Sequence, residues 1–307
     1  MTKPLALVLK GDGINCDNET VWALELAGFC AQSVHVSSFI ENQNDLKQAK
    51  LLALPGGFAF GDEIASGKVL ALKLRQRVMD TLHQFIDDSG LVLGICNGFQ
   101  VLTQLGILPR SEAQSKRIVT LTKNSHGHFN NRWVDLQVTL PSPPGVIYSG
   151  SGAAAATGHS ERASFFAGLK NIELPIRHGE GRVVLDTGIG ENLASAGIAA
   201  STGKAKGQSE CELEQLKDEV RACAPLRYKD DVNGSFDRIA ALTNGDGRVM
   251  GLMPHPEAFV RWTQHPSWTT LRLDRPELAE AKHPLDLPVE DRPHGFTILR
   301  NAYEMVN

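Results

Sequence analysis

A cysteine at an expected strand-to-helix turn is the residue of this sequence best placed for nucleophilic chemistry. Cys96 follows the apolar run Leu91–Ile95, is flanked by Gly94 and Gly98, and precedes a helical pattern. This is the strand–turn–helix context of a nucleophile elbow, with sulfur in place of the serine oxygen. Glycines suit such a turn because a Cβ on either side would crowd it. The helix N-terminus that follows favours thiolate over thiol, so the sequence predicts a reactive Cys96.

A base and an orienting carboxylate for this thiol are found far downstream. The apolar run Val249–Leu252 leads into Met253, and His255 and Glu257 then flank a proline. A cysteine nucleophile needs such a base, held in turn by a third group. Taken singly, a cysteine after a strand is more often a small buried hydrophobe, and a His-Pro-Glu is more often a turn. Together, the two patterns predict a triad of Cys96, His255 and Glu257.

A second glycine-rich turn can supply hydrogen-bond donors to this triad. The apolar run Leu51–Leu54 ends in Pro-Gly-Gly-Phe at 55–58. Taken alone, such a motif is more often a simple tight turn. A nucleophile at the end of the next strand favours a functional interpretation, because exposed N–H groups there stabilise a developing oxyanion. We therefore expect the oxyanion to lie between the N–H groups of Gly57 and Asn97.

Cys16 is a rival nucleophile in the same set of loops. It lies between Asn15 and Asp17 at an expected helix start, where the helix dipole would lower its pKa. No base is paired with it in the sequence, so we interpret it as a small residue packed under the site. The remaining thiols are interpreted as ordinary buried or surface groups: Cys30, Cys211 and Cys223.

Composition excludes several classes of protein. The chain has 307 residues, of which 42% are hydrophobic, enough for a sizeable core. A net charge of −4 and a pI near 6.2 give no indication of nucleic-acid binding. No apolar run is long enough to span a bilayer, and residues 1–4 lead directly into an expected strand, so we expect no secretory leader. The scattered cysteines suit a reducing compartment, so we expect a cytoplasmic protein.

The elements that must position these residues alternate along the first third of the chain. Continuous apolar strands separated by helical patterns predict an α/β fold with an open, mainly parallel sheet and helices on both faces. The expected strands are 5–9, 34–39, 51–54 and 91–95, and the expected helices are 18–27, 69–86 and 98–105. Ligands bind at the carboxyl ends of strands in such sheets. Chain order places the loops 11–17 and 55–62 and Cys96 at that edge.

The rest of the chain is less regular, but we expect one domain over residues 1–307. Four strands with few helices between them predict an antiparallel flank, at 118–122, 133–140, 172–176 and 183–185. A Gly-, Ala- and Ser-rich stretch and a polar helix near 210–220 predict a mobile surface insertion over 188–222. The strands 239–242 and 249–252 return to the core. A Pro-, Trp- and His-rich segment, 260–294, and a helix near 296–306 form a C-terminal extension over 260–307.

Several motifs together resemble a known family. The motifs at 55–58, 94–100 and 254–257 are similar to the signatures of class I, triad-type glutamine amidotransferases. More narrowly, the chain resembles the glutaminase component of phosphoribosylformylglycinamidine synthase, on four further runs of sequence. These runs are Gly13–Asp17, Gly57–Asp62, Pro175–Arg182 and Asn233–Ser235. The similarity extends over residues 5–259 and implies the flavodoxin-like amidotransferase fold.

The resemblance implies a reaction and a role for each site residue. Cys96 would attack the side-chain amide carbon of glutamine, His255 would accept and return the proton, and Glu257 would orient His255. Ammonia would leave, and water would hydrolyse the γ-glutamyl thioester to glutamate. Gln100 and the backbone of His178 and Gly179 would hold the amino-acid head of glutamine.

The resemblance also implies partners. Ammonia would pass to a large synthase subunit, with or without a small accessory subunit, for ATP-dependent amidation of formylglycinamide ribonucleotide in purine biosynthesis. No glycine-rich phosphate loop is found in this sequence, which fits ATP and Mg on the partner and no cofactor on this chain. The alternatives are a stand-alone glutaminase, another cysteine-dependent amide hydrolase, and a non-catalytic subunit that retains the fold.

Three departures from the family put the partner geometry in doubt and leave the triad intact. Ser125–Phe129 replaces a Ser-Gly-Arg-Phe-like run, and its His126 and His128 lack a third ligand, so we expect no metal site. The other two departures are the 188–222 insertion and the long 260–294 segment. In that segment Trp262 and Trp268 are either exposed interface anchors or packed locally.

Overall fold

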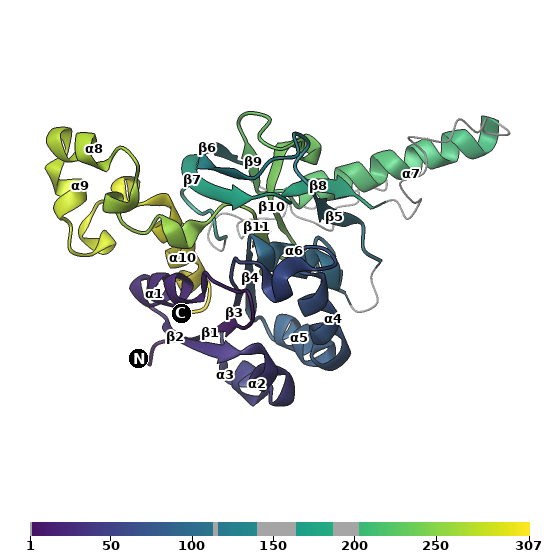
Figure 1. Cartoon of the computed structure of the whole chain (residues 1–307), viewed down its shortest axis with the longest axis horizontal. Helices are drawn as coiled ribbons and strands as arrows, with labels where there is room; N and C mark the ends of the chain where they lie inside the picture. The colour runs from purple at the N-terminus through teal and green to yellow at the C-terminus, as the bar shows by residue number, and fades with distance from the viewer. Residues whose placement is uncertain (1, 113–115, 140–163, 187–202) are drawn as a thin grey trace, which may run out of the picture.

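The computed structural model describes residues 2–112, 116–139, 164–186 and 203–307, and its centre is a nine-stranded sheet (Figure 1). The strand order is β2-β1-β3-β4-β11-β10-β9-β6-β7. The parallel part consists of β2 (Cys30–His35), β1 (Leu5–Lys10), β3 (Leu51–Leu54), β4 (Leu91–Ile95) and β11 (Val249–Leu252). The antiparallel part consists of β10 (Ile239–Thr243), β9 (Leu226–Tyr228), β6 (Asn130–Val138) and β7 (Asn171–His178). The predicted α/β fold with an antiparallel flank is confirmed.

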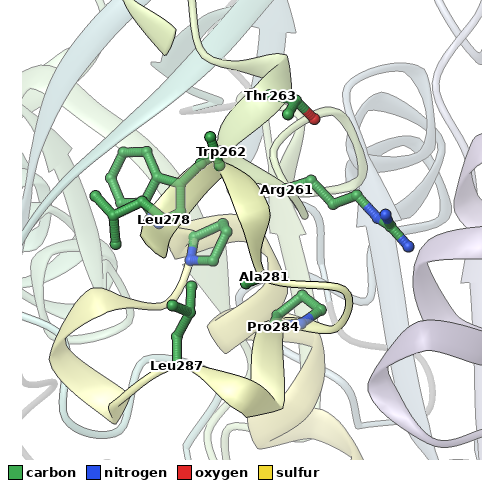
Figure 2. A pocket seen from close by; sticks show the side chains of 9 residues that line it. Arg261, Trp262, Thr263, Leu278, Ala281, Pro284 and Leu287 are labelled. Atoms are coloured by element: carbon green, nitrogen blue, oxygen red, sulfur yellow. The ribbon is translucent and has the colours of Figure 1, made fainter. Parts of the chain in front are cut away.

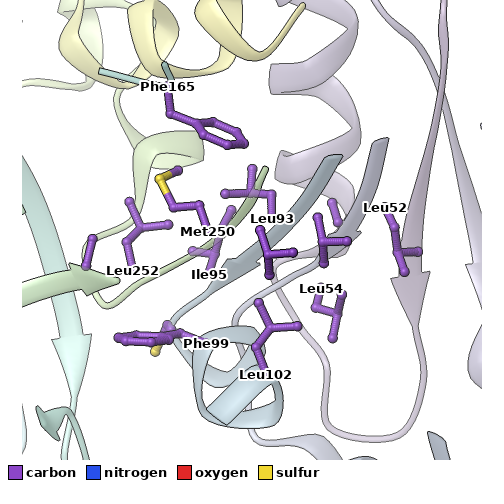
Figure 3. Packing of buried hydrophobic residues seen from close by; sticks show 14 of the residues in the cluster. Leu52, Leu54, Leu93, Ile95, Phe99, Leu102, Phe165, Met250 and Leu252 are labelled. Atoms are coloured by element: carbon purple, nitrogen blue, oxygen red, sulfur yellow. The ribbon is translucent and has the colours of Figure 1, made fainter. Parts of the chain in front are cut away.

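Helices cover both faces of the parallel part, which explains why its central strands read as unbroken apolar runs. The helices α1 (Asp17–Ala27) and α10 (His294–Glu304) lie on one face, and α4 (Lys68–Arg77) and α6 (Asn97–Leu105) lie on the other (Figure 1). Figure 3 shows the core on both sides of these strands, with Phe165 on the α10 side and Phe99 and Leu102 of α6 on the opposite side.

Two expected elements of the first third are wrong in their bounds. The strand expected at 34–39 ends at His35, and the apolar residues Val36 and Phe39 belong to a short helix, α2 (Val36–Glu41). The reason is that β2 is an edge strand with mostly polar, exposed residues, so the apolar signal comes from the buried face of the helix beside it. The helix expected at 69–86 is two helices, α4 and α5 (Met79–Asp87), which meet at the buried, non-helical Val78.

The flank also differs from expectation. β5 (Val119–Thr122) and β8 (Arg182–Leu185) pair only with each other, as a separate two-stranded sheet. The three-residue strand β9 was not predicted, because a run so short carries no periodic signal. The strand expected at 133–140 is β6, which begins earlier, at Asn130, and ends at Val138; residue 140 and the stretch 187–202 lie outside the described residues. A small helix, α3 (Asn44–Gln48), also lies before β3.

The polar helix of the predicted insertion is longer than expected. It is α7 (Gly203–Ala222), which projects from the body of the molecule in Figure 1. Its last turns are tied to the body by two ion pairs, Arg110–Glu219 at 2.6 Å and Arg221–Asp237 at 2.8 Å.

The segment that precedes α10 is more ordered than its composition suggested. It contains α8 (Trp268–Asp274) and α9 (Pro276–Glu280), and a cavity of about 30 Å³ lies between Trp262 and Leu278 (Figure 2). Trp262 packs edge-on against Phe259 at 5.2 Å, and its Nε1 donates to the Asp291 carbonyl at 2.7 Å. Trp262 and Trp268 are each half-buried, and the contacts of Trp262 favour local packing of that residue over the alternative of an exposed anchor. Within the described ranges, no helix combines the length and apolar character that a membrane crossing requires.

Candidate active site

The predicted elbow has the backbone strain that such a turn requires. Cys96 joins β4 to α6 with φ 50° and ψ −102°, a conformation that costs a non-glycine residue about 1–3 kcal/mol. The flanking glycines allow α6 to approach the sheet closely. A Cβ on Gly98 would collide with the carbonyl oxygen of Leu54, and a Cβ on Gly94 would lie 2.6 Å from Leu102. The predicted reason for these glycines is therefore confirmed.

Strand pairing brings the base to the thiol. β11 runs parallel to β4, with Leu252 opposite Ile95, so the segments that follow the two strands emerge side by side. His255 and Glu257 are both buried, and the Nδ1–H of His255 donates to Glu257 Oε1 at 2.6 Å. Because Nδ1 is bonded to Glu257, Nε2 is the ring nitrogen of His255 that is left for proton transfer.

The electrostatics of this pair favour a charged imidazole. Burial by itself would lower the pKa of His255, but the Glu257 carboxylate and contacts with the Cys16 and Cys96 thiols raise that pKa well above its usual value. Neither thiol makes a well-directed hydrogen bond to Nε2, which has no partner among the described residues. The Cys96 thiol donates to the Arg177 carbonyl at 3.6 Å. An imidazolium held here would stabilise a neighbouring thiolate.

The predicted oxyanion donors face no competing acceptor. Within the part of the chain that the structure describes, neither the Gly57 nor the Asn97 backbone N–H donates to a protein carbonyl. The loop at Gly57 is fixed because Phe58 N donates to Gly13 O at 2.7 Å. Gly57 has φ 144°, and a Cβ there would lie 2.6 Å from that same carbonyl oxygen, so the position requires glycine. The Asn97 side chain ties the elbow to this loop by accepting from Ala59 N at 3.2 Å.

Both ends of the Gln100 side-chain amide are hydrogen-bonded within the protein. Its oxygen accepts from Asn97 Nδ2 at 2.9 Å, and its Nε2 donates to the carbonyl of Glu180. Gln100 therefore ties α6 to the turn after β7. Its direct contact with glutamine stays a prediction.

His178 and Gly179 are organised by a residue that the sequence reasoning missed. Asn124 Nδ2 donates to the His178 carbonyl at 2.9 Å, Asn124 N donates to the Gly179 carbonyl at 2.9 Å, and His178 Nδ1 lies 3.0 Å from Asn124 Oδ1. Burial lowers the pKa of His178 to about 4, so its ring is neutral near pH 7. No local motif marks Asn124, because its role depends on contact with a turn more than fifty residues away.

Cys16 lies beside His255, the predicted base. A Cβ placed on Gly56 would lie 2.9 Å from His255 Cε1, 3.3 Å from Cys16 Sγ and 3.5 Å from Cys96 Cβ. The expectation that the pKa of Cys16 is lowered is wrong, because burial raises this pKa and outweighs the lowering by the neighbouring His255 ring. Donor atoms of Cys16, His255 and Glu257 lie within 4.8 Å of one another, but Glu257 is already bonded to His255.

A cleft of about 300 Å³ opens onto Cys96, the predicted nucleophile. Besides Cys96, His255, Cys16 and Gly57, it is lined by residues to which the sequence analysis gave no role in the site, namely Asn15, Glu19, Phe58, Phe129, Asn131 and Arg177. The exposed His126 and His128 rings stack at 5.9 Å, and no metal-binding cluster among the described residues includes them. The cleft has the size of a small-molecule site, and the predicted nucleophile lines it.

Comparison with known proteins agrees with this geometry. The family model of the CobB/CobQ-like glutamine amidotransferase domain matches residues 3–283. The chain is 33% identical over 268 residues to "phosphoribosylformylglycinamidine synthase subunit PurQ" of Dehalococcoides mccartyi, covering 87% of this chain and 90% of the relative. A protein of the same name from Methanococcus maripaludis is 30% identical over 306 residues, 99% of this chain and 98% of the relative. A chain in the solved structure of PurLQS from Thermotoga maritima has a TM-score of 0.57 and 30% identity, over 87% of this chain and 94% of that one.

Proposed function

Because the chain belongs to the CobB/CobQ-like glutamine amidotransferase family, we propose that it is the glutaminase subunit of a phosphoribosylformylglycinamidine synthase. The observation that carries the proposal is the elbow cysteine Cys96 beside the buried His255–Glu257 pair, at the base of a cleft. The similarity to subunits of this synthase extends over most of the chain and supports the choice of substrate.

In the proposed mechanism, the Cys96 thiolate attacks the side-chain amide carbon of glutamine. The N–H groups of Gly57 and Asn97 stabilise the oxyanion that develops on the amide oxygen. Nε2 of His255 gives its proton to the leaving ammonia, and a γ-glutamyl thioester remains on Cys96. His255 then takes a proton from water, which attacks the thioester and releases glutamate. Glu257 holds the ring in the tautomer and orientation that both steps need.

Ammonia passes to a synthase partner, which we place by similarity to the proteins named above. A large subunit, with a small accessory subunit, uses ATP and Mg to convert formylglycinamide ribonucleotide to formylglycinamidine ribonucleotide. This chain holds no cofactor in the proposal and meets neither nucleic acid nor membrane. Its five cysteines are all unpaired, which suits the reducing cytoplasm.

The test is the Cys96→Ala variant in the assembled complex. We expect loss of glutamine-dependent amidation and retention of ammonia-dependent amidation, because only glutamine hydrolysis needs the thiolate. Cys30→Ala, at an exposed position on the edge strand, is the matched control and keeps both activities. A glutamine-like electrophile is expected to label Cys96 and not Cys16 in peptide mass mapping.

The alternatives predict other results. A non-catalytic subunit would show no glutamine turnover with or without partner, and a stand-alone glutaminase would show full turnover alone. A hydrolase for another amide would leave glutamine intact while Cys96 still reacts with general thiol reagents. Loss of the ammonia-dependent activity in a correctly assembled Cys96→Ala complex would contradict the proposed division of labour.

A further inference from the structure

The cleft above Cys96 contains two opposite charges that have no ion-pair partner. Glu19 is half-buried in the first turn of α1, and Arg177 is exposed on β7. Among the described residues, neither side chain makes a hydrogen bond or an ion pair, with the other or with a third residue. Arg110, Arg221 and Arg275, by contrast, each hold a carboxylate. Both charges at the cleft are therefore available to a ligand.

Each charge belongs to a wall that is fixed to the catalytic centre. The Arg177 carbonyl accepts from the Cys96 thiol at 3.6 Å, so Arg177 lies next to Cys96 in the wall of the cleft. Glu19 lies three residues after Cys16, on the same side of the helix, and its charge contributes to the raised pKa of that thiol. The two side chains thus reach the cleft from the β7 wall and from the α1 wall.

The ligand chemistry that fits these walls is a free amino acid. Glutamine with its amide carbon at Cys96 carries an ammonium and a carboxylate on one carbon, three bonds from the reacting carbon. A guanidinium binds a carboxylate through two parallel hydrogen bonds, and a carboxylate binds an ammonium. Phe58 and Phe129, which are 50% and 53% exposed, line the same cleft and can cover the methylene groups between.

We propose that Arg177 binds the α-carboxylate of glutamine and that Glu19 binds its α-ammonium, so that the pair selects free glutamine over its blocked derivatives. This inference rests on the proposed glutaminase function. The Gln100 side chain is already hydrogen-bonded to Asn97 and Glu180, so the charged head group of glutamine needs other partners. Arg177 and Glu19 provide them. Arg177 and Glu19 are then specificity residues, separate from the triad.

The experiment removes one charge from the protein by substitution, and separately removes the α-carboxylate or α-ammonium charge from the substrate. With the full chain and its synthase partner, kcat/KM is measured for glutamine, glutamine α-amide and N-acetylglutamine. Arg177→Ala is expected to lower kcat/KM for glutamine about 10- to 100-fold, mainly through KM, as for the loss of a charged hydrogen bond. The same variant should leave kcat/KM for the α-amide unchanged. Arg177→Lys is expected to recover part of the loss.

Glu19→Gln is expected to show the complementary pattern. It should lower kcat/KM for glutamine and leave kcat/KM unchanged for N-acetylglutamine, which lacks the ammonium. The control variants are Arg132→Ala and Glu25→Gln, which remove exposed charges from the neighbouring strand β6 and from α1 outside the cleft. Both controls should retain the preference for glutamine.

The outcomes separate this inference from the proposed function. If Arg177→Ala lowers turnover of glutamine and its α-amide equally, or reduces only the response to the partner, Arg177 does not bind the carboxylate and the inference is overturned. An active wild-type complex without preference for glutamine over its blocked derivatives overturns it as well. A folded wild-type complex that turns over none of the three substrates removes the proposed function and the inference together.

Discussion

Acidification should destabilise this protein through one buried histidine. His178 is 3% exposed, its Nδ1 faces Asn124 Oδ1, and its Nε2 has no partner among the described residues. Burial, followed by the charges of His255 and His126, lowers its pKa from 6.5 to about 4. Between these two values the unfolded chain binds a proton at this position and the folded chain does not. The free energy of unfolding must therefore fall as the pH drops below 6.5, and this loss ends near pH 4.

The size of the effect follows from the pKa difference. A shift of about 2.5 units corresponds to about 3 kcal/mol when complete, since one unit is worth about 1.4 kcal/mol. At pH 5 about 2 kcal/mol of it is already lost, and most carboxylates are still ionised there.

The assay is urea unfolding of the full chain at pH 7 and pH 5. His178→Gln keeps a donor for Asn124 but does not titrate, so it should lose about 2 kcal/mol less than the wild type over this interval. His128→Gln, at an exposed ring, is the control and should behave as the wild type. The buried His294, whose pKa burial also lowers, is common to all three proteins and cancels in the comparison. An equal loss in wild type and His178→Gln would refute the reasoning.

Three further predictions concern the reaction. His255→Ala should reduce glutamine turnover more than Glu257→Gln, because general acid–base transfer contributes about 10²–10⁴-fold and the second change leaves the imidazole in place; the opposite order, with folding intact, would contradict the assigned roles. Gly57→Ala should lower kcat about 10²–10³-fold by displacing an oxyanion donor, and an unchanged kcat would remove Gly57 from that role. The chain alone should turn over glutamine slowly and be activated by its synthase partner, and Trp268→Ala should weaken that activation while leaving the chain folded. Full activity without a partner would exclude this coupling.

The sequence predicted best the elements whose signals are local. β3 and β4 have the predicted bounds residue for residue, because each strand is buried on both faces and is apolar throughout. The glycines around Cys96 mark the elbow in the sequence, although part of the crowding that they relieve comes from Leu54 on the neighbouring strand β3. The edge strand β2 was misplaced because an edge strand needs few apolar residues, and the neighbouring helix α2 supplied a stronger pattern.

The parts of the site that the sequence missed depend on long-range pairing. Asn124, in the loop after β5, contacts His178 at the end of the distant strand β7. Arg177 enters the cleft because β7 pairs with β6, with Asn131 opposite Arg177. Glu19 faces the same cleft because the loop before α1 is held by the turn at Gly56, which accepts from Cys16 N at 3.2 Å. No local sequence pattern predicts these contacts, because Arg177 and Glu19 come to the same cleft only when the sheet is assembled.

The two cysteines at the cleft show why a helix start alone does not make a nucleophile. Both precede a helix and both lie near His255, so the dipole argument applies equally to them. Burial overrides it at Cys16, whose pKa is raised. Of the two, Cys96 combines the strained elbow backbone with a following N–H, and a second N–H at Gly57, that have no acceptor among the described residues. In the proposed mechanism, an attack by Cys96 develops its oxyanion against two donors, and this difference in transition-state stabilisation supports Cys96 rather than Cys16 as the nucleophile.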